Sequence, residues 1–346
     1  MTIIKNKIRV LVVDDSVVFR ETLARGLALD PSIDVVAMAS DPYEARDKIL
    51  EFEPDVMTLD VEMPRMNGIE FLKRLMPQYP LPVVVVSAVS ENVFDALHAG
   101  AVDFVTKPDF RAGNGMGSLI HELIIKIKVA STANISLRTE TANVAVATRN
   151  PKISPQDCII AIGASTGGTE AIHSIVKTFP ADMPGTVIVQ HMPPVFTALY
   201  ATRLNNSCAV EVKEAKTGDK VLPGRVLIAP GNYQMRIKRI NREFVIDCFH
   251  GEKVSGHCPS VDVLFHSVAN QVGSNAIGVI LTGMGRDGAQ GLLAMRRMGA
   301  RTIGQDEQSS VVYGMPRAAF EIGAVHEQAS LDLIPRKIFS LVSGKR

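Results

Sequence analysis

Three side chains in the second half of the sequence have the types needed for nucleophilic hydrolysis: Ser165, His191 and Asp287. A serine hydroxyl is a weak nucleophile unless a base removes its proton as it attacks. A histidine titrates near neutral pH and can take that proton, then return it to the leaving group. A carboxylate can hold the imidazole in the required tautomer and stabilise its charged form. If the fold brings them together, these residues predict a Ser-His-Asp mechanism.

Ser165 lies in a turn between a predicted strand and a predicted helix. The apolar run from Ile159 to Ile162 lacks alternation, which is typical of a buried parallel strand, and Thr169 to Phe179 has helical spacing. Between them, Gly163-Ala-Ser-Thr-Gly167 fits the pattern G-x-S-x-G, in which a strained turn lifts the hydroxyl to the helix N-terminus. Two simpler interpretations are a serine N-cap and a glycine loop that binds a phosphate.

His191 and Asp287 also follow predicted strands. One strand ends at His191-Met-Pro-Pro194, and another, Ala276–Leu281, leads into the loop that carries Asp287. Because the carboxyl ends of parallel strands meet at one edge of a sheet, we expect these residues and Ser165 to share an edge. The simpler interpretations are that Asp287 caps the helix that follows it and that His191 is an ordinary strand-end histidine.

The first 130 residues alternate five apolar runs with five helical patterns. This alternation predicts an α/β domain with a parallel sheet covered on both faces. The runs are Ile8–Val13, Ile33–Ala39, Val56–Leu59, Val83–Val86 and Val102–Val105. In the second half, alternation on both sides of Asn241-Arg242 predicts a hairpin of Gln234–Ile240 with Glu243–Phe249.

Polar residues follow four of the first five runs. Asp14 and Asp15 close the first run, Asp60 the third and Ser87 the fourth, while Lys107 follows the fifth. Three carboxylates at one edge repel each other unless a cation joins them, and oxygen ligands with room for water suit Mg²⁺. A lysine and a hydroxyl nearby would complete a site for a phosphoryl group. Each residue alone is also a common turn former.

Length and composition indicate a soluble protein of two domains. The chain has 346 residues, 46% of them hydrophobic, and a net charge of +1. The sequence shows no basic stripe with interleaved aromatic residues, which argues against a nucleic-acid partner. No apolar run reaches the ~18 residues of a membrane span, and the N-terminus lacks the features of a signal peptide. We therefore expect a cytoplasmic protein without membrane insertion.

The remaining compositional signals concern the cysteines and the domain boundary. The four cysteines are far apart and form no C-x-x-C pair, so reduced thiols are expected rather than disulfides or a zinc site. They are Cys158, Cys208, Cys248 and Cys258. Residues 130–152 are rich in Ser, Thr, Asn and Ala without a sustained period. This stretch predicts a linker between a first domain of residues 1–129 and a second of residues 153–346.

The first domain resembles the receiver domains of response regulators over residues 7–128, through the strand-end residues above and Asp60-Val-Glu-Met-Pro64. The resemblance implies a flavodoxin-like (βα)5 fold, with Asp60 as phosphoacceptor and Asp14, Asp15 and Asp60 as ligands of Mg²⁺. It further implies phosphate contacts from Ser87 and Lys107, and a mobile aromatic side chain at Phe104.

The whole set of motifs resembles the protein-glutamate methylesterase (CheB) family of bacterial chemotaxis. The motifs are Gly163-Ala-Ser-Thr-Gly-Gly168, Gln190-His-Met-Pro193 and Leu281-Thr-Gly-Met-Gly-Arg-Asp-Gly288. The resemblance implies a doubly wound, mostly parallel α/β catalytic domain with Ser165 as nucleophile, His191 as base and Asp287 as the acid that orients it. It also implies support from the hydroxyl of Thr166 and an oxyanion-hole N–H from Met284.

The implied activity is hydrolysis of glutamate methyl esters on methyl-accepting chemotaxis proteins, with deamidation of receptor glutamines by the same machinery. No cofactor is implied for the esterase reaction. The chemotaxis histidine kinase CheA would be the phosphodonor, and the unphosphorylated receiver would cover the active site.

Two other functions are compatible with parts of the sequence. The glycines of Gly163 to Gly168 after a strand also resemble a dinucleotide-binding turn, but Gln190-His191 stands where such a site needs an acidic residue at the end of the next strand. A non-catalytic output domain switched by the receiver is the second alternative. A DNA-binding output is disfavoured, because the net charge is close to zero and no helix-turn-helix is recognisable.

Overall fold

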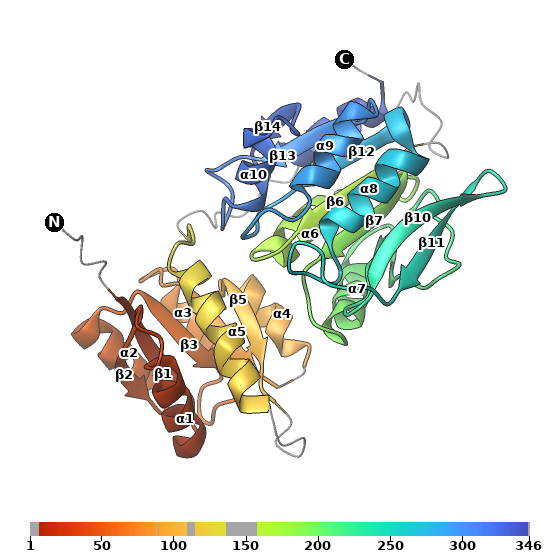
Figure 1. Cartoon of the computed structure of the whole chain (residues 1–346). Coiled ribbons are helices and arrows are strands. Elements are labelled where there is room, and N and C mark those ends of the chain that lie inside the picture. Colours follow the sequence, from red (N-terminus) through yellow and green to blue (C-terminus); the bar gives the residue numbers. More distant parts are fainter. Residues whose placement is uncertain (1–6, 89, 109–114, 136–157, 345–346) are drawn as a thin grey trace. The chain divides into compact units, whose positions relative to one another are not determined.

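The computed structural model describes residues 7–88, 90–108, 115–135 and 158–344 and divides the chain into two compact units, Met1–Arg138 and Thr139–Arg346 (Figure 1). Each unit has a parallel sheet of its own. The division falls inside the stretch predicted as a linker, of which residues 136–152 lie outside the described residues. Among the helices of the described ranges, none combines the length and the apolar character that crossing a bilayer requires.

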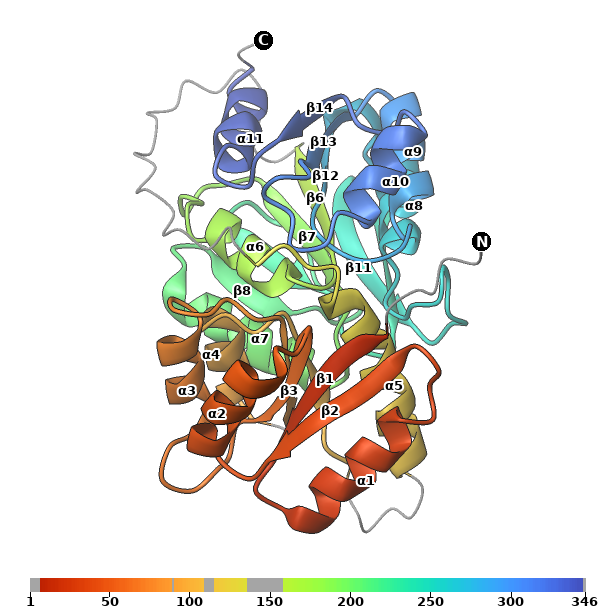
Figure 2. The same ribbon diagram turned by 90° about the vertical axis from the view of Figure 1, so that its left-hand side faces the viewer.

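The first unit is a five-stranded parallel sheet with strand order β2-β1-β3-β4-β5, which confirms the predicted flavodoxin-like fold. Figure 2 shows α1 and α5 on one side of the strands and α2, α3 and α4 on the other. The strands are β1 (Ile8–Val13), β2 (Ile33–Ala39), β3 (Val56–Asp60), β4 (Val83–Ser87) and β5 (Asp103–Thr106). The helices are α1 (Val17–Leu27), α2 (Pro42–Phe52), α3 (Gly68–Leu75), α4 (Asn92–His98) and α5 (Gly115–Ala130).

Local sequence explains where the helices beside the acidic residues begin. The side chain of Ser16 accepts a hydrogen bond from the N–H of Phe19 at the start of α1, and Asn67 caps α3 in the same way. A Cβ atom at Gly68 would lie 2.4 Å from the backbone oxygen of Asp60. The turn after β3 is therefore packed so closely on the Asp60 backbone that it requires glycine at this position.

The second unit is a seven-stranded parallel sheet of order β14-β13-β12-β6-β7-β9-β8, which confirms the predicted α/β class. The strands are β6 (Ile159–Ala164), β7 (Gly185–Gln190), β8 (Glu211–Glu214), β9 (Arg225–Ile228), β12 (Ala276–Ile280), β13 (Arg301–Gln305) and β14 (Glu327–Ala329). The helices are α6 (Gly168–Val176), α7 (Phe196–Ser207), α8 (Val261–Gln271), the short 3₁₀ turn η2 (Gly273–Asn275), α9 (Ala289–Arg297), α10 (Met315–Glu321) and α11 (Ile334–Val342).

The predicted hairpin is confirmed residue by residue. Strands β10 (Gln234–Ile240) and β11 (Glu243–Phe249) pair in antiparallel fashion, and the turn residues Asn241 and Arg242 both have positive φ. Side chains of the hairpin, including Met235, Ile237 and Ile246, belong to the same buried apolar core as α8 and α9. In Figure 1, α8 lies between the hairpin and α9. The N-terminus of α8 and the loop before α9 contribute residues to the site described next.

Candidate active site and phosphoacceptor site

Ser165, His191 and Asp287 follow three neighbouring strands of the second sheet. Ser165 follows the middle strand β6, His191 follows β7 and Asp287 follows β12, and all three strands are parallel. The backbones also meet directly: the His191 N–H donates to the Ala164 carbonyl (3.1 Å), and the Ser165 N–H donates to the Thr282 carbonyl (3.0 Å). The three residues therefore share one edge of the sheet, as the parallel arrangement predicts.

A buried hydrogen bond joins the histidine and the aspartate. Nε2 of His191 lies 2.8 Å from Oδ2 of Asp287, whose residue is 1% exposed. Burial raises the pKa of the Asp287 carboxyl, but the hydrogen bond and charge of His191 and donors at the start of α8 outweigh it, so that this pKa is lowered. Asp287 is thus an anion placed to hold the imidazole.

Asp287 caps a helix, but not the one that follows it. The N-cap of α9 is Gly288, with no side-chain cap. The Asp287 carboxylate instead accepts hydrogen bonds from the N-terminus of α8: from the Ser260 hydroxyl (2.7 Å) and from the N–H groups of Val261 (2.7 Å) and Asp262 (3.0 Å). Local capping as the whole explanation of this residue is therefore wrong. The α8 contacts were not predicted, because their partners lie 25–27 residues away in sequence.

The ring of His191 faces Asp287 through Nε2 and leaves Nδ1 available. A neutral imidazole that donates to the carboxylate carries its proton on Nε2, so Nδ1 has the free lone pair. Nδ1 is buried and has no hydrogen-bond partner among the described residues. The Ser165 hydroxyl likewise forms no hydrogen bond within the part of the chain that the structure describes. The structure thus joins His191 to Asp287 and does not join Ser165 to His191 by a hydrogen bond; before substrate binds, such bonds are often long.

The turn that carries Ser165 is constrained on several sides. Gly167, at φ +76°, is the N-cap of α6 and no side chain caps this helix, so the interpretation of Ser165 as an N-cap is wrong. A Cβ atom at Gly163 would lie 2.2 Å from a methyl group of Val261, so this glycine lets α8 pack on β6. The Gln190 amide donates to the carbonyls of Ser165 (2.9 Å) and His191 (3.2 Å). One buried amide thereby ties both backbones together.

Two further residues named from the sequence lie beside the turn. Thr166 is buried, and its carbonyl accepts a hydrogen bond from the Thr282 hydroxyl (3.0 Å). Met284 follows Gly283, where a Cβ atom would lie 2.7 Å from Cβ of Ser165. Met284 is 49% exposed, and its backbone N–H donates to no other residue of the described ranges. An N–H that binds nothing else among the described residues, next to a glycine that packs on Ser165, is available to an added oxygen.

His257 is a site residue that the sequence pattern did not identify. Its ring stacks on that of His191, with centroids 3.6 Å apart and an interplanar angle of 8°. Burial, followed by the proximity of His191, lowers the pKa of His257 from 6.5 to about 4. Because His257 is neutral at neutral pH, it covers one face of the His191 ring without placing a positive charge there. No local sequence signal distinguishes it from an ordinary histidine.

The lowered pKa of His257 predicts a pH-dependent contribution to stability. Between pH 6.5 and 4 the unfolded chain binds a proton at this ring and the folded chain does not, so the contribution is complete above pH 6.5 and is lost as pH falls toward 4. With allowance for solvent screening of the partly exposed ring, it amounts to about 2 kcal/mol.

Thermal unfolding between pH 7.5 and 4.5 tests this contribution. We expect the melting temperature of His257→Phe to decrease less than that of the wild type over this pH interval. His266→Phe changes an exposed histidine on α8 and serves as control. Equal losses in the wild type and His257→Phe would contradict the assignment.

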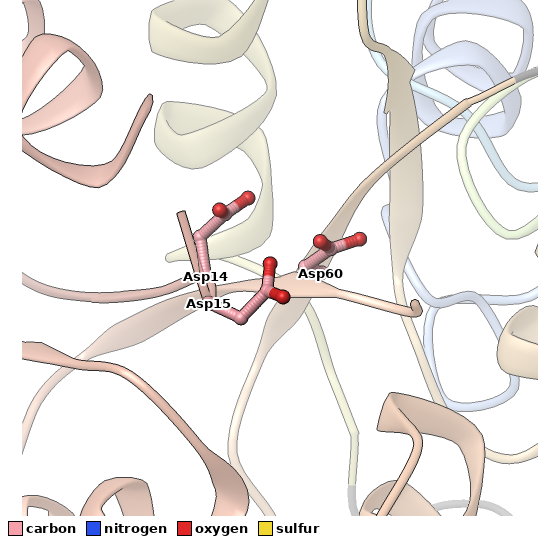
Figure 3. Close-up of side chains that lie close together, drawn as sticks. All are labelled: Asp14, Asp15 and Asp60. Carbon is pink, nitrogen blue, oxygen red and sulfur yellow. The ribbon is translucent and has the colours of Figure 1, made fainter. Parts of the chain in front are cut away.

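The first unit gathers its acidic residues at the ends of β1 and β3. Figure 3 shows the carboxylates of Asp14, Asp15 and Asp60 side by side, and one oxygen of each lies within 4.8 Å of the others. Nζ of Lys107 lies 2.8 Å from Oδ2 of Asp14 and 2.6 Å from Oδ2 of Asp60. Burial raises the pKa of the Asp60 carboxyl even though Lys107 acts in the opposite direction. Burial acts to lower the pKa of Lys107, but the hydrogen bonds of its ammonium group to Asp14 and Asp60 have the larger effect, so that the pKa of Lys107 is raised.

The residues around this cluster fit a divalent cation and a phosphoryl group. Three carboxylates, one exposed and two buried, offer the oxygen ligands that Mg²⁺ prefers while leaving room for water. The Ser87 hydroxyl at the end of β4 is completely buried and has no hydrogen-bond partner within the described part of the chain, so it can donate to an added oxygen. Phe104, on β5 next to Val85 of β4, is buried at 4% exposure.

Comparisons with known proteins agree with both units. The family model for CheB methylesterase matches residues 160–338, and that for the response regulator receiver domain matches residues 10–112. A relative from Syntrophomonas wolfei, named protein-glutamate methylesterase/protein-glutamine glutaminase 2, is 60% identical over 97% of this chain and 98% of its own. A relative from Syntrophotalea carbinolica, named protein-glutamate methylesterase/protein-glutamine glutaminase, is 56% identical over 98% and 99%.

A solved structure supports the assignment of the second unit. The crystal structure of the Thermotoga maritima CheB methylesterase catalytic domain is 37% identical, covers 54% of this chain and 98% of that one, and superimposes with a TM-score of 0.53. The chain belongs to the CheB methylesterase family and carries a response regulator receiver domain in its first unit.

Proposed function

We propose that the chain hydrolyses glutamate methyl esters on chemoreceptors with Ser165 as nucleophile. As the serine oxygen attacks the ester carbonyl, its proton passes to Nδ1 of His191, while Asp287 stabilises the resulting imidazolium through Nε2. His191 then protonates the methoxide, and methanol leaves an acyl-enzyme. Water, activated by the same nitrogen, breaks the acyl bond, so that glutamate is released and the serine regains its proton.

The oxyanion of the tetrahedral intermediate needs hydrogen-bond donors near Ser165. The N–H of Met284 is one candidate, because no other residue of the described ranges accepts its hydrogen bond and it adjoins Gly283, which packs against Ser165. Thr166 is a second supporting residue in our proposal. A preorganised donor of this kind is worth about 3 kcal/mol of transition-state stabilisation.

One observation carries this proposal: a buried hydrogen bond joins His191 and Asp287, which follow the two strands that flank the strand before Ser165. Deamidation of receptor glutamines is a second reaction of the same site, since it passes through a similar tetrahedral intermediate with ammonia as leaving group. The names of the two relatives above include this activity.

The receiver unit supplies control by phosphorylation in this proposal. Asp60 accepts the phosphoryl group from a histidine kinase, for which we propose CheA. When bound, Mg²⁺ would neutralise charge between the phosphoryl oxygens and the carboxylates of Asp14, Asp15 and Asp60. Lys107 and Ser87 would bind the new oxygens, and Phe104 would respond to the movement of Ser87. The boundaries that we propose remain 1–129 for the receiver, 130–152 for the linker and 153–346 for the catalytic domain.

One assay tests both halves of the proposal. Methanol release is measured from membranes that carry methyl-accepting chemotaxis proteins methylated with a radioactive methyl group, with and without a small-molecule phosphodonor. We expect release in both conditions and faster release with the phosphodonor and Mg²⁺. Absence of release in both conditions would contradict the esterase proposal, whereas equal rates would contradict only the control by phosphorylation.

Replacing the phosphoacceptor should uncouple control from catalysis. We expect Asp60→Asn to keep the unstimulated rate of methanol release and to lose all stimulation by the phosphodonor, because an amide oxygen does not form a stable acyl phosphate. Removal of Mg²⁺ with a chelator should have the same effect on the wild type. Asp55→Asn changes another acidic residue of this unit, whose carboxylate binds the Arg9 N–H (2.8 Å), and should respond normally. Stimulation that persists in Asp60→Asn would contradict this role.

A further inference from the structure

Helices α8 and α9 cap each other through two buried carboxylates. Asp287 directly precedes the N-cap of α9, yet it binds the first N–H groups of α8. Asp262 is the second residue of α8, yet its Oδ1 accepts the N–H of Gly291, the third residue of α9, at 2.8 Å. The chain at the start of each helix therefore carries the carboxylate that satisfies free N–H groups of the other helix.

Asp262 acts on Asp287 from two directions. Its own N–H donates to Oδ1 of Asp287 (3.0 Å), and its side chain holds the start of α9, the helix that Asp287 precedes. The Ser255 hydroxyl donates to the other oxygen, Oδ2, of Asp262 (3.1 Å). Asp262 is 6% exposed and Asp287 is 1% exposed. A displacement of the Asp262 carboxylate would consequently move the group that binds His191.

The two carboxylates also interact by charge. Burial, together with the negative charge of Asp287, raises the pKa of the Asp262 carboxyl, while the Gly291 N–H and the Ser255 hydroxyl act in the opposite direction. The other titratable groups that act on this pair and its neighbours are His191 after β7, and His257 with Lys253 from the segment between β11 and α8. Asp262 is thus a second buried acidic group beside Asp287, and the proposed reaction does not use it directly.

We propose that Asp262 is a positioning residue that holds Asp287 against His191, and that its carboxylate adds a second negative charge beside Asp287 that acts on the imidazole. This inference rests on the function proposed above for Ser165, His191 and Asp287. It assigns to the start of α8 a part in setting how readily the histidine takes and releases its proton.

The substitution Asp262→Asn separates the charge from the cap. An asparagine oxygen still accepts the Gly291 N–H, but the negative charge that favours the protonated imidazole is lost. In the full chain labelled with ¹³C-histidine, we expect the titration midpoint of the His191 resonance, assigned by its loss in His191→Gln, to move to lower pH by about half a unit or more. A merely structural role would not move this midpoint, so an unchanged value would overturn the proposal.

The substitution Asp262→Ala removes both charge and cap. We expect the same displacement of the midpoint and, in addition, a kcat for methanol release at least about tenfold below that of Asp262→Asn, with KM unchanged. Equal kcat values in the two variants would overturn the positioning role. If the alanine variant fails to fold, the midpoint in the asparagine variant still decides the proposal.

Two controls separate this inference from the proposed function. Asp219→Asn changes another carboxylate of the same unit that binds a backbone N–H, that of Lys216 (2.7 Å), and should leave the His191 midpoint in place. A shift of similar size in this control would overturn the assignment to Asp262. Wild-type and Ser165→Ala rates are measured alongside: equal rates would refute the esterase proposal, whereas the histidine titration reports on Asp262 without any catalysis.

Discussion

Replacement of Ser165 by alanine is expected to lower the rate of methanol release by about 10⁴-fold or more, because no other group in the proposed mechanism forms the acyl-enzyme. The fold should survive. The Ser165 N–H and carbonyl bind Thr282 and Gly168, and these contacts do not involve the side chain. The measurement is methanol release together with far-UV circular dichroism of the variant.

Another Ser–His pair in the same unit provides a matched control for this prediction. The Ser207 hydroxyl lies 3.2 Å from Nε2 of His173, but Ser207 is the last residue of α7 and not a strand-end residue. We expect Ser207→Ala to retain the wild-type rate. Substantial hydrolysis by Ser165→Ala would show that Ser165 is not the nucleophile and would favour a non-catalytic role for the turn.

Replacement of Asp287 by asparagine is expected to lower the rate about 10³- to 10⁴-fold and also to destabilise the second unit. The Asp287 carboxylate accepts hydrogen bonds from Ser260, Val261 and Asp262 in addition to contacting His191. A side-chain amide has only one oxygen, so its NH₂ group must face some of these donors, at a cost of about 1–3 kcal/mol for each donor left unpaired. Loss of the negative charge would also leave the imidazolium without its counter-ion.

This double effect can be measured by comparing rate and thermal unfolding. The matched control is Asp306→Asn, because Asp306 also accepts a backbone N–H (2.9 Å) and a serine hydroxyl (2.6 Å), both from Ser309, but binds no histidine of the described ranges. We expect the control to lose stability and to keep the wild-type rate. A near-normal rate in Asp287→Asn would show that His191 does not depend on this carboxylate.

The central strands of both sheets were predictable from sequence, and the edges of the second sheet were not. Strands β3, β4, β6 and β12 are buried along their whole length, and burial on both faces makes a strand read as a continuous apolar run. The short edge strand β8 mixes exposed and buried residues, and β14 has only three residues. At this length neither alternation nor a continuous run can be distinguished from a loop.

The strand-end residues of the candidate site were predictable from the sequence, whereas the contacts around them were not. Ser165, His191 and Asp287 each follow a recognisable strand, and sheet geometry brings such positions together. The contacts of Asp287 with Ser260 and the stacking of His257 on His191 depend on how α8 packs on β6. Packing of this kind joins residues far apart in sequence and leaves no local pattern. The helix dipole and capping rules identify a free N-terminus but not its partner.

The placement of Ser165 on the middle of three strands explains the order of the residues along the chain. The strands that precede Asp287 and His191, β12 and β7, flank β6 in space, but β12 follows β7 in sequence only after the hairpin and α8. The order Ser, His, Asp is therefore a consequence of the connectivity of the strands and not of the chemistry. A circular permutation that opened the chain at the Asn241-Arg242 turn would read Asp, Ser, His while keeping the same three neighbours on the sheet. A classification of hydrolases by residue order alone would assign such a chain to another group, although Ser165, His191 and Asp287 would keep their positions on the sheet.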